Sequence, residues 1–264
     1  MNTYDNELNI IENLQLIPKS FVCVFPHNSN TISILNSIRE NENWEKWSNS
    51  SSKSAPPPDF YSDGYGLMME VMRVDDPTYK NKKGKLVNPT NIKESKIRKE
   101  ILQSDWIKSF PNIKNIFINA PTNLPSKEDH NYKYYCDSFK RVLKHHIEKI
   151  PLYRKNHPNH KLIFLIFDET SPYLVVDTEE EASKNVLPGQ IITGKIHNPW
   201  LDKAMIDVLK GADIDYIIWF KPYNHINFVD ENKMLPLVFV LDTKSINDLS
   251  VEDYPANLVV SAEE

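Results

Sequence analysis

The sequence predicts an α/β fold: a single domain with a mixed, partly antiparallel central sheet flanked by helices, and a helical segment at its N-terminus. Residues 161–167, KLIFLIF, are almost continuously apolar, which is typical of a strand covered on both faces. Apolar residues in 132–150 instead recur every three or four positions, which indicates an amphipathic helix. Buried strands that alternate with helices favour a mixed sheet between helical layers.

The first part of the chain is predicted to be mostly helical. Apolar residues lie at helical spacing in 7–17, where Pro18 ends the helix, and again in 31–47. Between these two helices, the run SFVCVF at 20–25 is a predicted strand.

Serine and proline are concentrated in residues 49–58, NSSSKSAPPP. These residues bury little surface, and three prolines in series favour an extended chain. The composition predicts a surface linker. It would divide an N-terminal helical segment, 1–48, packed on the core or appended to it, from an α/β core at 59–264.

The core begins with a predicted hairpin at 58–74, in which Asp63-Gly64 forms the turn between two aromatic and apolar runs. Gly211 is a natural stop for the helix that precedes it. The other predicted elements are a helix at 91–110, a strand at 113–120, a helix at 201–209, an antiparallel strand pair at 214–223 and 235–244, and an edge strand within 257–264.

Composition limits the classes of function. The chain has 264 residues and a net charge of -5, which argues against coating nucleic acid through bulk charge but leaves room for a local basic cleft. Neither a signal peptide nor an apolar stretch long enough to span a membrane is expected, so a cytoplasmic location is predicted. Lysine far outnumbers arginine, and asparagine and isoleucine are abundant, which is typical of an AT-rich bacterial or phage genome.

The two cysteines, Cys23 and Cys136, lie in an apolar run and on a helical pattern. Neither belongs to a CxxC or CxxH spacing, so a disulfide or a zinc site is not indicated. Both are predicted to be small buried side chains in a reducing compartment.

Several common motifs are absent. The six glycines form neither GxGxxG nor GxxxxGK[ST], and the chain has no GxSxG or HExxH. His145 and His146 are adjacent on a predicted helix, so their side chains diverge by about 100° and cannot chelate an ion together. His146 lies on the apolar face and is interpreted as a core histidine.

Two carboxylates stand out in the predicted hairpin. Asp59 begins the first strand and Glu70 lies in the middle of the second, so the pair can meet across the hairpin. Two carboxylates close together repel each other unless a cation neutralises them. A hard cation such as Mg²⁺ prefers such oxygen ligands.

Pro58-Asp59 followed by Glu70-Val71-Met72 resembles the PD-(D/E)XK nuclease superfamily, over residues 58 to 73. The resemblance implies that Asp59 and Glu70 hold a metal ion that activates water at a phosphodiester. A nuclease or nuclease-like component of a bacterial defence or mobile-element system is therefore the first function predicted. The family's lysine would fall at Met72, and Arg73 faces the opposite side of the strand. Lys221 is a candidate for a lysine supplied from elsewhere.

Other carboxylates offer alternatives. Within the same family pattern, Asp242 and Lys244 form a DxK at a strand end, with Asp230 upstream, although an Asp at a strand end also commonly starts a turn. Asp168, next to Glu169, ends the most buried strand, where α/β folds place ligand groups. It is the third predicted metal ligand, or else a turn residue.

Two functions remain open from the sequence. Lysines after the hairpin suit phosphate contacts of a nuclease, or simply a solvated loop; these are Lys80, Lys82, Lys83 and Lys85. The alternative is a non-enzymatic protein that binds a protein partner, as an immunity, inhibitor or accessory subunit does. Such a protein should show an acidic or aromatic patch, which the aromatic residues of DFYSDGYG at 59–66 suit. Apart from either function, the simplest structural alternative is an edge hairpin whose carboxylates face solvent.

Overall fold

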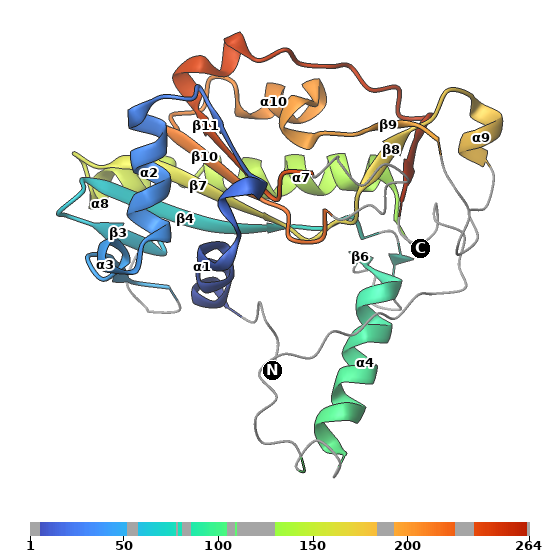
Figure 1. The fold of residues 1–264 in the computed structure, drawn as a ribbon, viewed down its shortest axis with the longest axis horizontal. Helices are drawn as coiled ribbons and strands as arrows, with labels where there is room; N and C mark the ends of the chain where they lie inside the picture. The colour runs from blue at the N-terminus through green and yellow to red at the C-terminus, as the bar shows by residue number, and fades with distance from the viewer. Residues whose placement is uncertain are drawn as a thin grey trace.

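The computed structural model describes residues 6–51, 58–77, 79–80, 86–104, 109, 130–183, 193–224 and 235–262. Its centre is a seven-stranded sheet with the order β1-β11-β10-β7-β4-β3-β2 (Figure 1). The strands are β1 (Val22–Phe25), β2 (Ser48–Asn49), β3 (Phe60–Ser62), β4 (Leu67–Val74), β7 (Lys161–Asp168), β10 (Tyr216–Phe220) and β11 (Val238–Asp242). The helices are α1 (Glu7–Leu16), α2 (Ser29–Arg39), α3 (Asn41–Trp44), α4 (Pro89–Gln103), α7 (Tyr132–Ile147), α8 (Ile150–Asn156), α9 (Glu179–Ser183) and α10 (Lys203–Leu209).

The sheet is mixed, as predicted. Strands β4, β7 and β10 run parallel to one another at its centre. Strand β11 is antiparallel to β10 and parallel to β1, while β3 and β2 continue the other side in antiparallel pairing. Helices cover both faces, so the predicted α/β fold class is confirmed.

Two smaller sheets lie beside the main one. The predicted edge strand within 257–264 forms, and it belongs to a three-stranded sheet rather than to the central one. The small strands are β8 (Tyr173–Val175), β9 (Lys195–Ile196) and β12 (Val259–Ser261) in one sheet, and β5 (Tyr79–Lys80) and β6 (Leu86–Val87) in the other. Three 3-10 helices complete the described elements: Lys19–Phe21, Pro199–Leu201 and Thr243–Asp248.

The central position of β7 follows from its sequence. Its residues from Leu162 to Asp168 are all buried, and β7 pairs with β4 on one side and β10 on the other. Because alternate side chains point to opposite faces, an apolar run without alternation must be covered on both. The prediction for this strand is confirmed.

Helices α1 and α2 pack on one face of the sheet, and α7 and α10 on the other (Figure 1). On the first face, Ile11 and Leu14 of α1 are fully buried against alternate side chains of the strands. On the second face, Phe139 of α7 stacks on Trp219 of β10 with a centroid separation of 5.0 Å. The N-terminal segment is therefore packed on the core.

The ends of the predicted linker are tied to the hairpin. Ser48 in β2 pairs with Tyr61 in β3, and the amides of Ser50 and Ser51 donate to the Asp59 carbonyl at 2.7 and 3.0 Å. Residues 52–57 of the linker lie outside the described part of the chain. The same holds for the predicted strand at 113–120.

The predicted strand pairs form. Phe60 pairs with Met69 and Ser62 with Leu67, which makes β3 and β4 an antiparallel hairpin. Its turn ends at Gly66, whose φ of 59° is readily adopted only by glycine. The antiparallel pairing of β10 with β11 is confirmed as well.

Two predicted helices are divided. The helix expected at 31–47 becomes α2 and α3, because the backbone of Glu40 between them is extended. The helix expected at 132–150 ends at Ile147, and α8 begins at Ile150. Pro151 has no N–H with which to continue the hydrogen-bond ladder of α7.

Cys136 is buried, as predicted, but Cys23 is exposed. Strand β1 lies at the edge of the sheet with a neighbour on one side only, so part of it remains uncovered. The apolar run around Cys23 did not reveal this edge position. No helix within the described residues combines the length and apolar character that crossing a membrane requires.

Candidate functional site

Asp59 and Glu70 lie opposite each other across the hairpin. Asp59 immediately precedes Phe60, which pairs with Met69, so the next pair along the two strands is Asp59 and Glu70. Glu70 is only 4% exposed, in the middle of β4. The alternative in which both carboxylates face solvent is therefore wrong for Glu70.

The two carboxylates are close enough to influence each other's charge. Asp59 Oδ2 accepts a hydrogen bond from the Val71 amide at 2.9 Å, which fixes the side chain across β4. Burial and the charge of Glu70 raise the pKa of Asp59 to about 7, although the charge of Lys149 acts in the opposite direction. Asp59 is thus poised between its neutral and charged forms near neutral pH.

Only one oxygen of Glu70 is satisfied. Glu70 Oε1 is 3.0 Å from His146 Nδ1 on α7. Glu70 Oε2 is buried and has no hydrogen-bond partner in the described part of the chain. The Tyr153 hydroxyl lies nearby on α8, 3.4 Å from His146 Nδ1, and burial and the charge of Glu70 raise its pKa. A buried carboxylate oxygen without a donor is costly and calls for a cation or a water.

His146 was missed as a site residue. Its place on the apolar stripe of α7 indicated a core histidine, whereas it is partly buried and directed at Glu70. The helical spacing correctly placed His146 on the face that meets the sheet. Its partner could not be identified, since that depends on which strand lies below the helix.

Lys221 and Asp168 do not join the Asp59–Glu70 pair. Asp168 pairs with Val74, and Val74 lies four residues after Glu70 in β4. Along the strand direction, Glu70 and Asp168 are therefore roughly 13 Å apart. Lys221 follows β10 and its Nζ is 3.6 Å from Asp168 Oδ1. The predicted set of three carboxylates and a lysine is therefore divided between two places on one face of the sheet.

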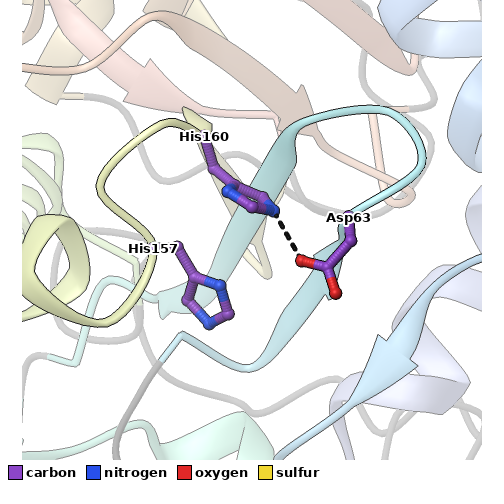
Figure 2. Close-up of side chains that lie close together, drawn as sticks. All are labelled: Asp63, His157 and His160. Carbon is purple, nitrogen blue, oxygen red and sulfur yellow. Dashed lines mark hydrogen bonds and ion pairs between the residues drawn. The ribbon is translucent and has the colours of Figure 1, made fainter.

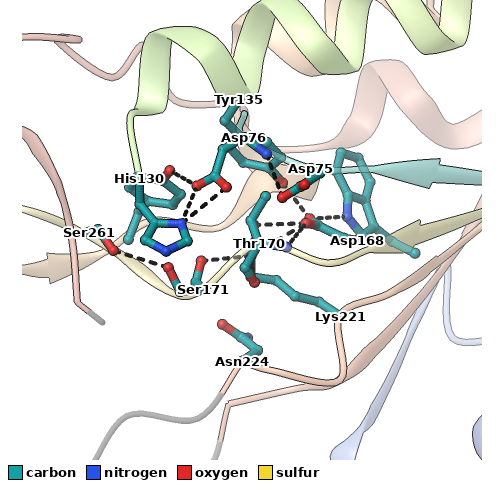
Figure 3. A network of polar contacts seen from close by, with 12 residues as sticks. Asp75, Asp76, His130, Tyr135, Asp168, Thr170, Ser171, Lys221, Asn224 and Ser261 are labelled. Carbon is teal, nitrogen blue, oxygen red and sulfur yellow. Dashed lines mark hydrogen bonds and ion pairs between the residues drawn. The ribbon is translucent and has the colours of Figure 1, made fainter. Parts of the chain in front are cut away.

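Asp168 is saturated with donors. Its Oδ1 accepts from the amide and hydroxyl of Thr170 at 3.1 and 2.7 Å, and its Oδ2 accepts from Trp219 Nε1 at 2.8 Å and from the Tyr135 hydroxyl (Figure 3). Its bond to the Thr170 amide is that of the turn residue given as its alternative role. Few lone pairs remain for an ion.

Lys221 is also held by its neighbours. It is 1% exposed, and its Nζ donates to the carbonyls of Thr170 and Ser171 at 2.9 and 3.0 Å. Burial lowers the pKa of Lys221, although the charge of Asp168 opposes this effect. The lysine joins the end of β10 to the chain that follows β7, and its contacts are structural.

Asp75 and Asp76 extend this network from the end of β4 (Figure 3). Both oxygens of Asp76 are 3.1 Å from His130 Nδ1, and Oδ2 also accepts from the Tyr173 hydroxyl. Burial favours the neutral form of Asp76, but the hydrogen bond and charge of His130 outweigh it and lower its pKa. Burial and the charge of Asp76 raise the pKa of Asp75 to about 8.

The rival pair Asp242 and Lys244 forms a helix cap. Asp242 Oδ1 accepts from the Lys244 amide at 3.0 Å at the start of the 3-10 helix Thr243–Asp248. This is the turn role given as its alternative. Asp230 lies outside the described residues, as do Lys82, Lys83 and Lys85, and the side chain of Lys80 is not described either.

The oxygens of Asp59 and Glu70 fit a hard divalent cation. Mg²⁺ is commonly held by one or two protein carboxylates and completes its shell with water. Glu70 offers Oε2, and Asp59 keeps one oxygen that does not bond to Val71. The available carboxylate oxygens therefore match the ligands that Mg²⁺ prefers.

Comparison with protein-family models, curated proteins and solved structures gives no match. The function is therefore inferred from the geometry of the hairpin and its neighbours.

Proposed function

We propose that the protein is a divalent-cation-dependent phosphodiesterase of the nuclease type, with Asp59 and Glu70 as the cation ligands. The observation that carries this proposal is the buried, unpartnered Oε2 of Glu70 opposite Asp59. The resemblance to the PD-(D/E)XK superfamily agrees with it, because that pattern requires the two acids on adjacent strands.

The pair is better suited to holding a cation than to stabilising the fold alone. Burial and Glu70 push the pKa of Asp59 up to about 7, so ionising both acids without a counter-charge is unfavourable. A cation between them would remove this penalty and would satisfy Oε2. Mg²⁺ bound there would lower the pKa of a water molecule and offset negative charge at the phosphodiester.

Neighbouring side chains have separate roles in this proposal. His146 Nδ1 holds Oε1 of Glu70 at 3.0 Å and so orients the carboxylate. Lys149, whose charge acts on Asp59, supplies positive charge for the phosphate where the family pattern has a lysine and this chain has Met72. Lys221 has no part, because it is committed to Thr170 and Ser171.

Hydrolysis of labelled oligonucleotides tests the proposal. Single- and double-stranded DNA and RNA are incubated with the full chain in Mg²⁺, in Mn²⁺ or in EDTA. Cleavage is expected only with the cation, and Asp59→Asn or Glu70→Gln should each slow it on the order of 10²–10³-fold, since a stabilising charge is lost.

Asp137→Asn is the matched control, because Asp137 is an exposed acid on α7 outside the hairpin. It should cleave at the parent rate. Absence of cation-dependent cleavage of every substrate by the parent would overturn the proposal and leave a partner-binding protein as the better interpretation.

A further inference from the structure

A second group of candidate ligands lies at the tip of the hairpin (Figure 2). Asp63 is in the turn between β3 and β4, His157 follows α8, and His160 immediately precedes β7. His160 Nε2 is 3.1 Å from Asp63 Oδ1, and one ligand atom from each of the three residues lies within 4.8 Å of the others. Two separate segments of the chain therefore bring two imidazoles and a carboxylate together.

We propose that Asp63, His157 and His160 form a binding site for a borderline divalent transition-metal ion of the Zn²⁺ class. This site is separate from the carboxylate pair of the proposed function. It shares no ligand with Asp59 and Glu70 and does not depend on any hydrolytic activity.

The donor set decides the class of ion. Imidazole nitrogens suit Zn²⁺, Co²⁺, Ni²⁺ and Cu²⁺, whereas Mg²⁺ prefers oxygen. Ligands about 2.0–2.2 Å from a tetrahedral zinc ion lie roughly 3.3–3.5 Å apart. The 3.1 Å between His160 Nε2 and Asp63 Oδ1 is close to such an edge.

The surroundings of the two histidines differ. The second nitrogen of His160, Nδ1, is buried and has no hydrogen-bond partner among the described residues. Tyr61 packs on His157 with ring centroids 4.4 Å apart, which limits the motion of that ring.

Three protein ligands leave at least one position for water or another ligand. An ion here would join the turn of the hairpin to the loop between α8 and β7. It would therefore fix the end of the hairpin relative to α8, the helix that carries Tyr153 next to Glu70.

A titration with Co²⁺ tests the site, since a Co²⁺ ion in a site of low coordination number absorbs visible light strongly. The full chain, freed of metal with a chelator, is titrated and then challenged with Zn²⁺ and, separately, with excess Mg²⁺. The parent should develop a saturable band that Zn²⁺ abolishes and Mg²⁺ leaves unchanged. Zn²⁺ should also raise its melting temperature.

His157→Ala, His160→Ala and Asp63→Asn should each weaken Co²⁺ binding by at least about tenfold, with far-UV circular dichroism unchanged. If an alanine variant fails to fold, Asp63→Asn can still be tested, because the Asp63 side chain is exposed and its substitution should not disturb the fold. His145→Ala removes an exposed histidine of α7 and should bind as the parent does. Failure of the parent to bind, or parental affinity in the three ligand variants, overturns the proposal.

Discussion

Glu70 is the residue on which the candidate centre depends. A carboxylate in the middle of a buried strand loses its hydration, and this cost is recovered only through hydrogen bonds or a counter-charge. His146 compensates Oε1, while Oε2 has no partner in the described chain. An apolar residue at this position would pack on the sheet without that cost, so the charge is better explained by function than by stability.

Asp59 gives the pair a measurable dependence on pH. Its pKa is about 7 in the folded chain against an ordinary value of 3.8, because burial and Glu70 disfavour its charged form. The folded state then holds a proton that the unfolded state has released between about pH 4 and pH 7. Stability must therefore fall as the pH rises through this range.

Asp59→Asn should remove this loss of stability. In EDTA at pH 8 the variant is expected to be more stable than the parent by on the order of 1–2 kcal/mol, after allowance for partial exposure. At pH 4 the difference should vanish. Urea unfolding across this pH range measures it, and a constant difference at every pH would contradict the assignment.

Among the elements, helix α7 contributes side chains both to the hydrophobic core and to the site at Asp59 and Glu70. Asn131 caps the helix by accepting from the Lys133 amide at 2.9 Å, and the apolar stripe then runs along β4, β7 and β10. Because Phe139 and His146 lie on the same face, the packing that buries Phe139 also positions His146 over Glu70.

Phe139→Ala should show how much this packing contributes. Phe139 is fully buried against Trp219, so its truncation removes transfer free energy and leaves a cavity, at a cost of about 3–5 kcal/mol. Urea unfolding followed by tryptophan fluorescence measures the change. Tyr134→Ala, at an exposed position of the same helix, should change stability little, and equal midpoints for Phe139→Ala and the parent would contradict this packing.

Periodicity in the sequence was enough to predict most described elements. The hairpin, the buried β7 and the β10–β11 pair follow from local patterns, since the residues that define them are neighbours in the chain. The contact of His146 with Glu70 could not be predicted, because it joins residues 76 positions apart. The Asp63–His157–His160 cluster was missed for the same reason, because Asp63 and His160 are 97 positions apart.

At the scale of the molecule, the strand order explains why the polar groups are separate. The parallel strands β4, β7 and β10 end at the same edge of the sheet, where Asp76, Asp168 and Lys221 form the satisfied network of Figure 3. Asp59 and Glu70 lie away from this edge, in the hairpin, where Glu70 is in the middle of β4. From the sequence, Asp168 and Lys221 could be assigned to the edge but not excluded from the site, since that requires the register of β4 against β7.

Binding of a divalent cation by Asp59 and Glu70 can be measured with Mn²⁺. The His157→Ala chain is used so that the histidine cluster cannot contribute, and electron paramagnetic resonance reports the free Mn²⁺. This chain should bind a single Mn²⁺ that Mg²⁺ displaces, and adding Glu70→Gln should abolish the binding because a fixed carboxylate ligand is lost. Equal Mn²⁺ binding with and without Glu70→Gln, or none in either chain, would contradict the claim.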